Sequence, residues 1–180
     1  GVITGPNQLH ISYIHTPMRY AWDLQHEYLP PSKRDLMATA MRWMLMRLRQ
    51  WDMLSAQRPD FLFANSHYIS RRISKVWRRE SQVLYPPVDT LKFFPGNSKE
   101  NFYVCACRLV PYKRVDLVLE AFKGMPDKQL VIIGDGPEFA ALSADLPRNV
   151  KMLGWQPMDV LLDHLRRARA FVFAGEEDFG

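Results

Sequence analysis

The sequence predicts an α/β protein with two Rossmann-like parallel sheets, and three observations lead to this prediction. From residue 102 onward, short apolar runs alternate with amphipathic segments of helical period, the pattern of consecutive βαβ units. The first 85 residues show the same alternation of apolar runs and helical segments, with longer helical segments. Pro86 and Pro87 stand between the halves, and consecutive prolines exclude helix. We therefore expect two domains, residues 1–87 and 88–180.

In the first half, residues 11–14 and 61–64 are apolar runs of strand length. The stretch 33–54 repeats apolar residues at helical spacing, which predicts a helix with a core-facing stripe of Leu36, Ala40, Met44, Leu48 and Trp51. Ser66 suits the N-cap of a further helix, whose stripe is Ile69, Ile73 and Val76.

In the second half, the pattern predicts strands over 102–107, 129–134, 149–153 and 170–174, and helices over 113–122, 137–144 and 158–168. Four such strands leave a Rossmann-like sheet incomplete. The sequence also starts at Gly1 rather than at a methionine and ends just after a strand. We therefore expect a piece of a longer protein, truncated at both ends.

The amino-acid composition limits the classes of function that this protein can have, but it does not identify one. Hydrophobic residues make up 47% and charged residues 24%, as in ordinary globular proteins. The net charge of +5 suits an anionic ligand or an acidic membrane surface and does not demand nucleic acid. Cys105 and Cys107 are expected to share one strand face as reduced core thiols of a cytosolic protein. The histidines His10, His26, His67 and His164 lack metal-ligand spacing, so no metal site is expected.

Two cations follow the strand at 102–107. Arg108 comes directly after the strand, and Lys113 is expected to begin the next helix. Two cations beside a helix N-terminus, at the carboxyl edge of a sheet, suit a diphosphate. The alternative is that both are surface residues at a strand-to-helix turn.

Three other features also fall at predicted strand ends. The turn from Gly134 to Glu138 either contacts a nucleotide or is only a tight turn. His15 follows the strand 11–14 and either binds a sugar or phosphate or has a structural role. Glu176 and Glu177 follow the strand 170–174, and the carboxyl ends of strands are where open α/β sheets bind ligands.

Four motifs together resemble family 4 of the retaining glycosyltransferases, closest to the mannosyltransferase-like enzymes of bacterial surface polysaccharides. They are His-Thr-Pro-x-Arg-Tyr-x-Trp-Asp (residues 15–23), Arg-Leu-Val-Pro-x-Lys (108–113), Gly-Asp-Gly-Pro-Glu (134–138) and the terminal Glu-Asp-Phe-Gly (177–180). The resemblance implies the GT-B fold, in which two Rossmann-like domains face a cleft. Residues 1–87 would belong to the acceptor side and 88–180 to the nucleotide-sugar side.

The resemblance also implies roles for individual residues. His15 and Glu177 would address the transferred sugar, with Glu176 the alternative if the register shifts by one. Donor binding would involve the residues Arg108, Lys113, Glu138, Trp155, Asp178, Phe179 and Gly180. Trp155 would border the nucleotide base, or else be a packing aromatic. The second glutamate of the family signature would fall after Gly180.

The implied function is transfer of a hexose, with mannose from GDP-mannose as the first expectation. The donor is a nucleotide sugar, the acceptor a glycan or lipid-linked molecule, and the configuration is retained without a metal or other cofactor. We expect a cytoplasmic protein with peripheral contact at the inner membrane surface, and this fragment alone is expected to be inactive. The alternative is a catalytically inactive relative that serves as a nucleotide-sugar-binding or scaffold module. A nicotinamide-dependent dehydrogenase is disfavoured because no Gly-x-Gly-x-x-Gly opens a helix.

Overall fold

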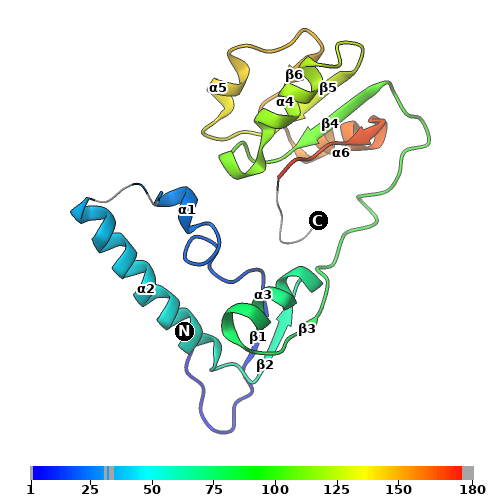
Figure 1. Cartoon of the computed structure of the whole chain (residues 1–180). Helices are drawn as coiled ribbons and strands as arrows, with labels where there is room; N and C mark the ends of the chain where they lie inside the picture. The colour runs from blue at the N-terminus through cyan, green and yellow to red at the C-terminus, as the bar shows by residue number, and fades with distance from the viewer. Residues whose placement is uncertain (1, 31, 33–34, 176–180) are drawn as a thin grey trace. The chain divides into compact units, whose positions relative to one another are not determined.

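The computed structural model describes residues 2–30, 32 and 35–175, and its two compact units divide between Pro87 and Val88 (Figure 1). Each unit contains its own parallel sheet, three-stranded in the first and four-stranded in the second. The predicted α/β class with parallel sheets is therefore confirmed. The assignment of an acceptor role and a donor role to the two halves stays a prediction.

The first unit is built on β1 (Ile11–Ile14), β2 (Phe61–Ala64) and β3 (Gln82–Val83), in the order β1-β2-β3. All are parallel, and Ile11 lies opposite Phe61 in the β1–β2 register. Helices α1 (Gln25–Tyr28) and α2 (Leu36–Ala56) precede β2, and α3 (His67–Trp77) precedes β3. The predicted strands at 11–14 and 61–64 are confirmed to the residue.

Helix α3 begins and packs as its sequence predicts. The Ser66 side chain accepts a hydrogen bond from the backbone N–H of Ile69 at 3.1 Å, which satisfies one of the free donors of the first turn. Ile69 and Ile73 are fully buried against the β2 face, and Val76 is partly buried. The helix ends at Trp77, and its C-cap residue Arg78 has a left-handed backbone with φ 55°.

The predicted core face of α2 is wrong. The helix buries Ala38, Leu45, Asp52 and Ala56, whereas Leu36 at the head of the predicted stripe is 89% exposed. Ala40, Met44 and Trp51 are exposed as well, and Leu48 is only partly buried. Apolar residues occur on every side of this helix, so several helical stripes fit the sequence equally well and periodicity cannot select the buried one.

The second unit contains β4 (Phe102–Ala106), β5 (Gln129–Ile133), β6 (Val150–Met152) and β7 (Ala170–Phe171). The strands are parallel in the order β6-β5-β4-β7. Helices α4 (Val115–Lys123), α5 (Phe139–Ser143) and α6 (Met158–Arg167) connect them. Every predicted strand and helix of this half is present, although β7 is shorter than the predicted strand.

Both faces of the β4–β5 pair are covered, as a parallel sheet requires. Cys105, Leu130 and Ile132 form one core with Val115, Val118 and Phe122 of α4. On the opposite face, Val104 and Ile133 pack against Leu161 and Leu165 of α6. The Asn149 side-chain amide connects the start of β6 to the segment between α4 and β5. Its Nδ2 donates hydrogen bonds to the backbone carbonyls of Phe122, Met125 and Lys128, at 3.0, 3.1 and 2.8 Å.

The connection from β4 to α4 differs from the prediction. Pro111–Lys113 forms a separate 3₁₀ turn, so Lys113 does not begin the helix. Arg114 follows with φ 52°, a left-handed conformation that interrupts the helical path, and α4 starts at Val115. The Arg114 guanidinium pairs with Asp116 in the first turn of α4, with a 2.9 Å contact between Nη2 and Oδ2.

Across the described ranges, no helix combines the length and the apolar composition that a membrane span requires.

Candidate functional site

A pocket of about 610 Å³ lies in the second unit where β4, β5 and β6 end. The residues that line it come from the last positions of β4 and β5, from the segments that follow β4, β5 and β6, and from α6. They are Ala106, Cys107, Arg108, Ile133, Gly134, Asp135, Trp155, Gln156, Met158 and Leu161. The carboxyl edge of a parallel sheet is where open α/β domains bind their ligands. The pocket is therefore the leading candidate for a binding site in this unit.

Two glycines let the ends of β4 and β5 approach closely. Gly134 has φ 141°, and a Cβ there would lie 1.9 Å from the carbonyl oxygen of Cys107. A Cβ on Gly136 would lie 2.3 Å from the carbonyl oxygen of Leu109. Neither position tolerates a side chain without backbone movement. The Gly134–Glu138 turn therefore has a structural role, and its Asp135 also lines the pocket.

The turn is held by backbone hydrogen bonds that fix the wall of the pocket. The Cys107 N–H donates to the Ile133 carbonyl at 3.1 Å, and the Leu109 N–H donates to the Asp135 carbonyl at 3.0 Å. Asp135 itself accepts from the Gly136 N–H through Oδ1 at 2.7 Å. The backbone from Cys107 to Leu109 is thus anchored before any ligand binds.

Two predicted donor-site residues, Arg108 and Trp155, line this pocket together. Arg108 is exposed, and the Trp155 indole is 72% exposed. An accessible guanidinium suits a phosphate, and an accessible indole suits a planar base. The pocket also includes Gln156, which sequence reasoning did not select; its Nε2 donates to the Leu153 carbonyl at 2.7 Å, which fixes the side chain.

Lys113 and Glu138 are not among the described residues that line the pocket. The Lys113 ammonium lies over the rings of Tyr112 and Phe173, at 5.2 and 5.4 Å from their centroids. Glu138 precedes α5, and its backbone N–H donates to the Leu109 carbonyl at 3.3 Å. The structure therefore gives Arg108 and Lys113 different immediate surroundings, although they stand at the two ends of one short connection.

Both cysteines belong to the core of the second unit, as predicted. Cys105 is 1% exposed, and Cys107 is partly buried, packs against the same core and is also among the residues that line the pocket. A hydrogen bond from the Cys105 thiol lowers the pKa of Cys107, and the Lys113 ammonium adds to this effect while desolvation opposes it. The same hydrogen bond, together with burial, raises the pKa of Cys105.

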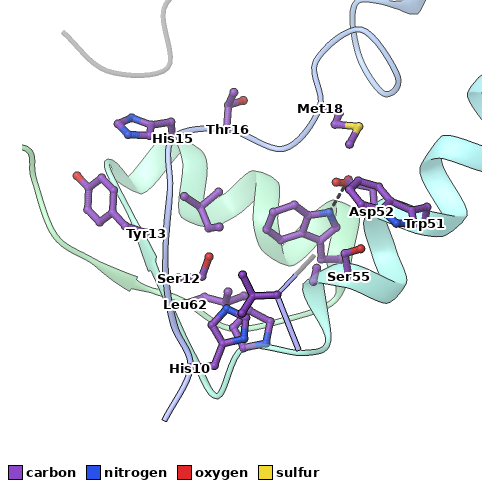
Figure 2. A pocket seen from close by; sticks show the side chains of 15 residues that line it. His10, Ser12, Tyr13, His15, Thr16, Met18, Trp51, Asp52, Ser55 and Leu62 are labelled. Carbon is purple, nitrogen blue, oxygen red and sulfur yellow. Dashed lines mark hydrogen bonds between the residues drawn. The ribbon is translucent and has the colours of Figure 1, made fainter. Parts of the chain in front are cut away.

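In the first unit, a pocket of about 500 Å³ extends along β1 (Figure 2). His15 lies at its rim beyond the carboxyl end of β1, exposed and edge-on to the Tyr13 ring at 5.3 Å between centroids. His10, which sequence reasoning gave no role, lies toward the other end, and its buried Nδ1 has no hydrogen-bond partner among the described residues. His15 is therefore accessible to a ligand and is not packed beneath its own unit.

The remaining predicted site residues, Glu177, Asp178, Phe179 and Gly180, and the alternative Glu176, lie outside the described part of the chain.

A parallel α/β sheet with a pocket at the carboxyl ends of its strands defines a ligand-binding α/β domain. Residues 89–180 match the family model described as glycosyl transferases group 1. The match covers just over half of the 180 residues and includes every residue that lines the pocket of the second unit. The chain therefore belongs to this glycosyltransferase family. A comparison with curated protein sequences found no match.

Solved structures of glycosyltransferases share the fold. A mutant of TarM from S. aureus, in complex with fondaparinux, α-GlcNAc-glycerol and UDP, has a TM-score of 0.65 and 16% identity over 97% of this chain. The pneumococcal O-GlcNAc transferase GtfA, in complex with UDP and GlcNAc, has a TM-score of 0.54 and 19% identity over 72% of this chain. The chain spans 34% and 28% of the lengths of these two proteins.

Proposed function

We propose that this protein transfers a hexose from a nucleotide-sugar donor to a glycan or lipid-linked acceptor, with retention of anomeric configuration. The observation that carries the proposal is the pocket at the carboxyl edge of the second unit, which combines Arg108 and Trp155 within the segment that matches the family. In this proposal, the pocket holds the nucleoside diphosphate of the donor.

The chemistry follows from the charge that develops as the donor reacts. Breaking the bond between the sugar and the phosphate leaves a nucleoside diphosphate with additional negative charge. An exposed Arg108 guanidinium stabilises this leaving group more than the intact donor, which lowers the barrier. Trp155 would stack on the base. Lys113 would approach the diphosphate from the β7 side, where Phe173 now contacts its ammonium.

Two residues, His15 and Glu177, would address the transferred sugar. His15 stands accessible beyond β1, and Glu177 follows the β7 region in sequence. We assign no protein nucleophile, because retention can proceed by attack on the same face, with a donor phosphate oxygen accepting the proton of the acceptor. Asp178, Phe179, Gly180 and Glu138 complete the proposed donor site.

The base and the sugar of the donor are identified by comparing two nucleotide sugars directly. The resemblance to mannosyltransferase-like enzymes makes GDP-mannose the first donor to test. The two solved structures described above contain UDP, and GlcNAc or a GlcNAc derivative, which makes UDP-GlcNAc the second donor to test. Transfer from one donor and not the other would decide between them.

A peripheral contact with the membrane surface is part of the proposal. Helix α2 exposes Trp43 and Leu54 beside Arg47, and its only acidic residue, Asp52, is buried. Exposed aromatic and apolar side chains interleaved with arginine suit an anionic lipid surface. Co-sedimentation with vesicles that contain anionic lipid, against neutral vesicles as the control, measures this contact.

The experiment that tests the proposed function compares Arg108→Gln with Arg148→Gln in the whole protein. Arg148 is an exposed arginine of the same unit that does not line the pocket. We expect Arg108→Gln to lower turnover about 10²-fold, corresponding to a few kcal/mol of lost charge stabilisation. Arg148→Gln should leave turnover unchanged.

Unchanged kinetics with the donor in Arg108→Gln would contradict the proposed role of the pocket in transfer. Nucleotide binding without transfer to any acceptor would instead favour the inactive binding module. Calorimetric titration with UDP and GDP therefore accompanies the transfer assay.

A further inference from the structure

The segment 15–23 follows β1, and the proposed reaction uses only its first residue, His15. The other residues of this motif have no role in that reaction. His15 and Thr16 lie together just beyond the carboxyl end of β1 (Figure 2). The His15 side chain is exposed and lies edge-on to the Tyr13 ring. The position of such an exposed side chain depends largely on the backbone that carries it.

The Arg72 guanidinium bridges the two ends of this segment. Its Nη1 donates to the Thr16 hydroxyl oxygen at 3.2 Å, and its Nη2 donates to Oδ1 of Asp23 at 2.5 Å. Thr16 comes directly after His15, and Asp23 is the last residue of the motif. A guanidinium is planar and rigid, so its two donors keep a fixed separation. One side chain therefore fixes where Thr16 and Asp23 lie relative to each other.

The bridge is anchored in the core of the first unit. Arg72 belongs to α3, whose Ile69 and Ile73 are fully buried. The Arg72 side chain is 12% exposed, and its guanidinium lies over the Tyr68 ring, 5.9 Å from the centroid. An ion pair that is this shielded from solvent is screened less by salt than a pair at the surface. The segment is therefore tied to a packed helix.

Each end of the bridge is also held by a contact within the segment. Asp23 pairs through Oδ2 with Nε of Arg19 at 3.6 Å, and the Leu24 N–H donates to the Arg19 carbonyl at 2.8 Å. The Thr16 hydroxyl donates to the Pro17 carbonyl at 3.0 Å, and Pro17 is fully buried. These contacts give the two acceptors of Arg72 defined positions, so the bridge restrains the backbone next to His15.

We propose that Arg72 is a positioning residue for His15, acting through the hydroxyl of Thr16. Arg72 does not touch the sugar; it holds the backbone that presents the imidazole. Without the bridge, the imidazole occupies its productive position less often, and such misplacement lowers turnover more than it lowers donor affinity. The positioning itself stands on the contacts above, whereas its effect on transfer rests on the proposed function.

The test uses four variants of the whole protein. Arg72→Met keeps an unbranched side chain without the charge and the donors. Thr16→Val removes the acceptor hydroxyl at nearly the same volume, whereas Thr16→Ser retains it. Arg71→Met changes an exposed arginine next to Arg72 on the same helix and is the matched control. If Arg72→Met does not fold, the comparison of Thr16→Val with Thr16→Ser decides.

The first measurement does not depend on activity. Proton–carbon NMR spectra of the histidine rings are recorded, with the His15 resonances assigned by their loss in His15→Gln. We expect these resonances to shift and broaden in Arg72→Met and in Thr16→Val. They should match the unaltered protein in Arg71→Met and stay close to it in Thr16→Ser. Unchanged His15 resonances in both Arg72→Met and Thr16→Val would overturn the positioning.

The second measurement is the transfer reaction with the donor that the protein accepts. Arg72→Met and Thr16→Val should lower kcat about tenfold and change the KM for the donor less than about twofold. Thr16→Ser and Arg71→Met should keep the kcat of the unaltered protein within about twofold. A similar loss of kcat in Thr16→Ser and Thr16→Val would overturn the role of the hydroxyl.

A double variant separates positioning from general stabilisation of the fold. If Arg72 acts through His15, then adding Arg72→Met to His15→Gln lowers kcat no further, because the positioned group is already absent. Losses that multiply in the double variant would show that Arg72 acts independently of His15 and would overturn the proposal.

If the unaltered protein transfers sugar from neither donor, the proposed function fails. The positioning of His15 is then judged by the NMR resonances alone.

Discussion

At the scale of single residues, Asp52 is the most consequential polar group of the first unit. It is buried on α2 (Figure 2). Its Oδ2 accepts hydrogen bonds from the indole N–H of Trp22 at 2.9 Å and of Trp77 at 2.7 Å. One carboxylate thus connects α2 to α3 and to the segment that follows β1. These contacts join parts of the chain that local sequence patterns cannot connect.

Asp52→Ala should lower the free energy of unfolding of the first unit by about 3 kcal/mol, because two indole N–H groups lose their acceptor. Asp52→Asn retains an acceptor oxygen and should cost about 1 kcal/mol. Urea denaturation followed by tryptophan fluorescence measures both. Glu80→Ala, at an exposed position of the same unit, is the control. Equal stability of Asp52→Ala and the control would contradict this account.

Residue positions were predictable where they depended only on the ends of strands. Arg108 and Trp155 follow short apolar runs, and the structure brings them to one pocket. Cys105 and Cys107 belong to the apolar run 102–107, and both contribute to the core of the second unit. Lys113 was misplaced because the backbone conformation of Arg114, at φ 52°, leaves no clear signal in the sequence when the residue is not glycine.

At the scale of elements, strands were easier to predict than helix faces. A strand in a parallel sheet is covered on both faces, so its sequence is a short continuous apolar run with clear ends. β4 and β5 illustrate this. The face of a helix is predicted from one buried stripe of apolar residues. Helix α2 carries apolar residues on every side, and several of them are exposed, so its sequence does not show which stripe is buried.

The end of α3 offers a test of element geometry. Arg78 caps the helix in the left-handed conformation, with φ 55°, which costs an ordinary residue about 1 kcal/mol relative to glycine. Arg78→Gly should therefore stabilise the first unit by about 0.5–1 kcal/mol. Arg78→Val should destabilise it, because a β-branched side chain fits this conformation poorly. Thermal unfolding of the three proteins gives the comparison, and a loss of stability in Arg78→Gly would contradict the assigned cap.

At the scale of the whole molecule, the described surface includes several large exposed apolar side chains. Helix α2 exposes Leu36, Trp43 and Leu54, and β7 presents Phe171, which is 51% exposed, at the edge of its sheet. Large exposed apolar surfaces and open sheet edges favour association.

The chain of 180 residues should therefore bind the dye ANS and should sediment as a concentration-dependent mixture of species. Arg148→Gln, far from these apolar residues in sequence, is a matched control that should behave like the unaltered chain. A monomer that neither binds the dye nor associates at high concentration would contradict this reading of the surface.

The central claim is that a nucleotide sugar occupies the pocket formed by the carboxyl ends of β4, β5 and β6. Hydrogen–deuterium exchange of the whole protein, with and without UDP-GlcNAc or GDP-mannose, tests it most directly. The account predicts slower exchange in residues 106–109, 133–136 and 154–157 with the donor that supports transfer, and no change in residues 145–149, which precede β6. Transfer activity with no protection of these three segments would contradict the claim.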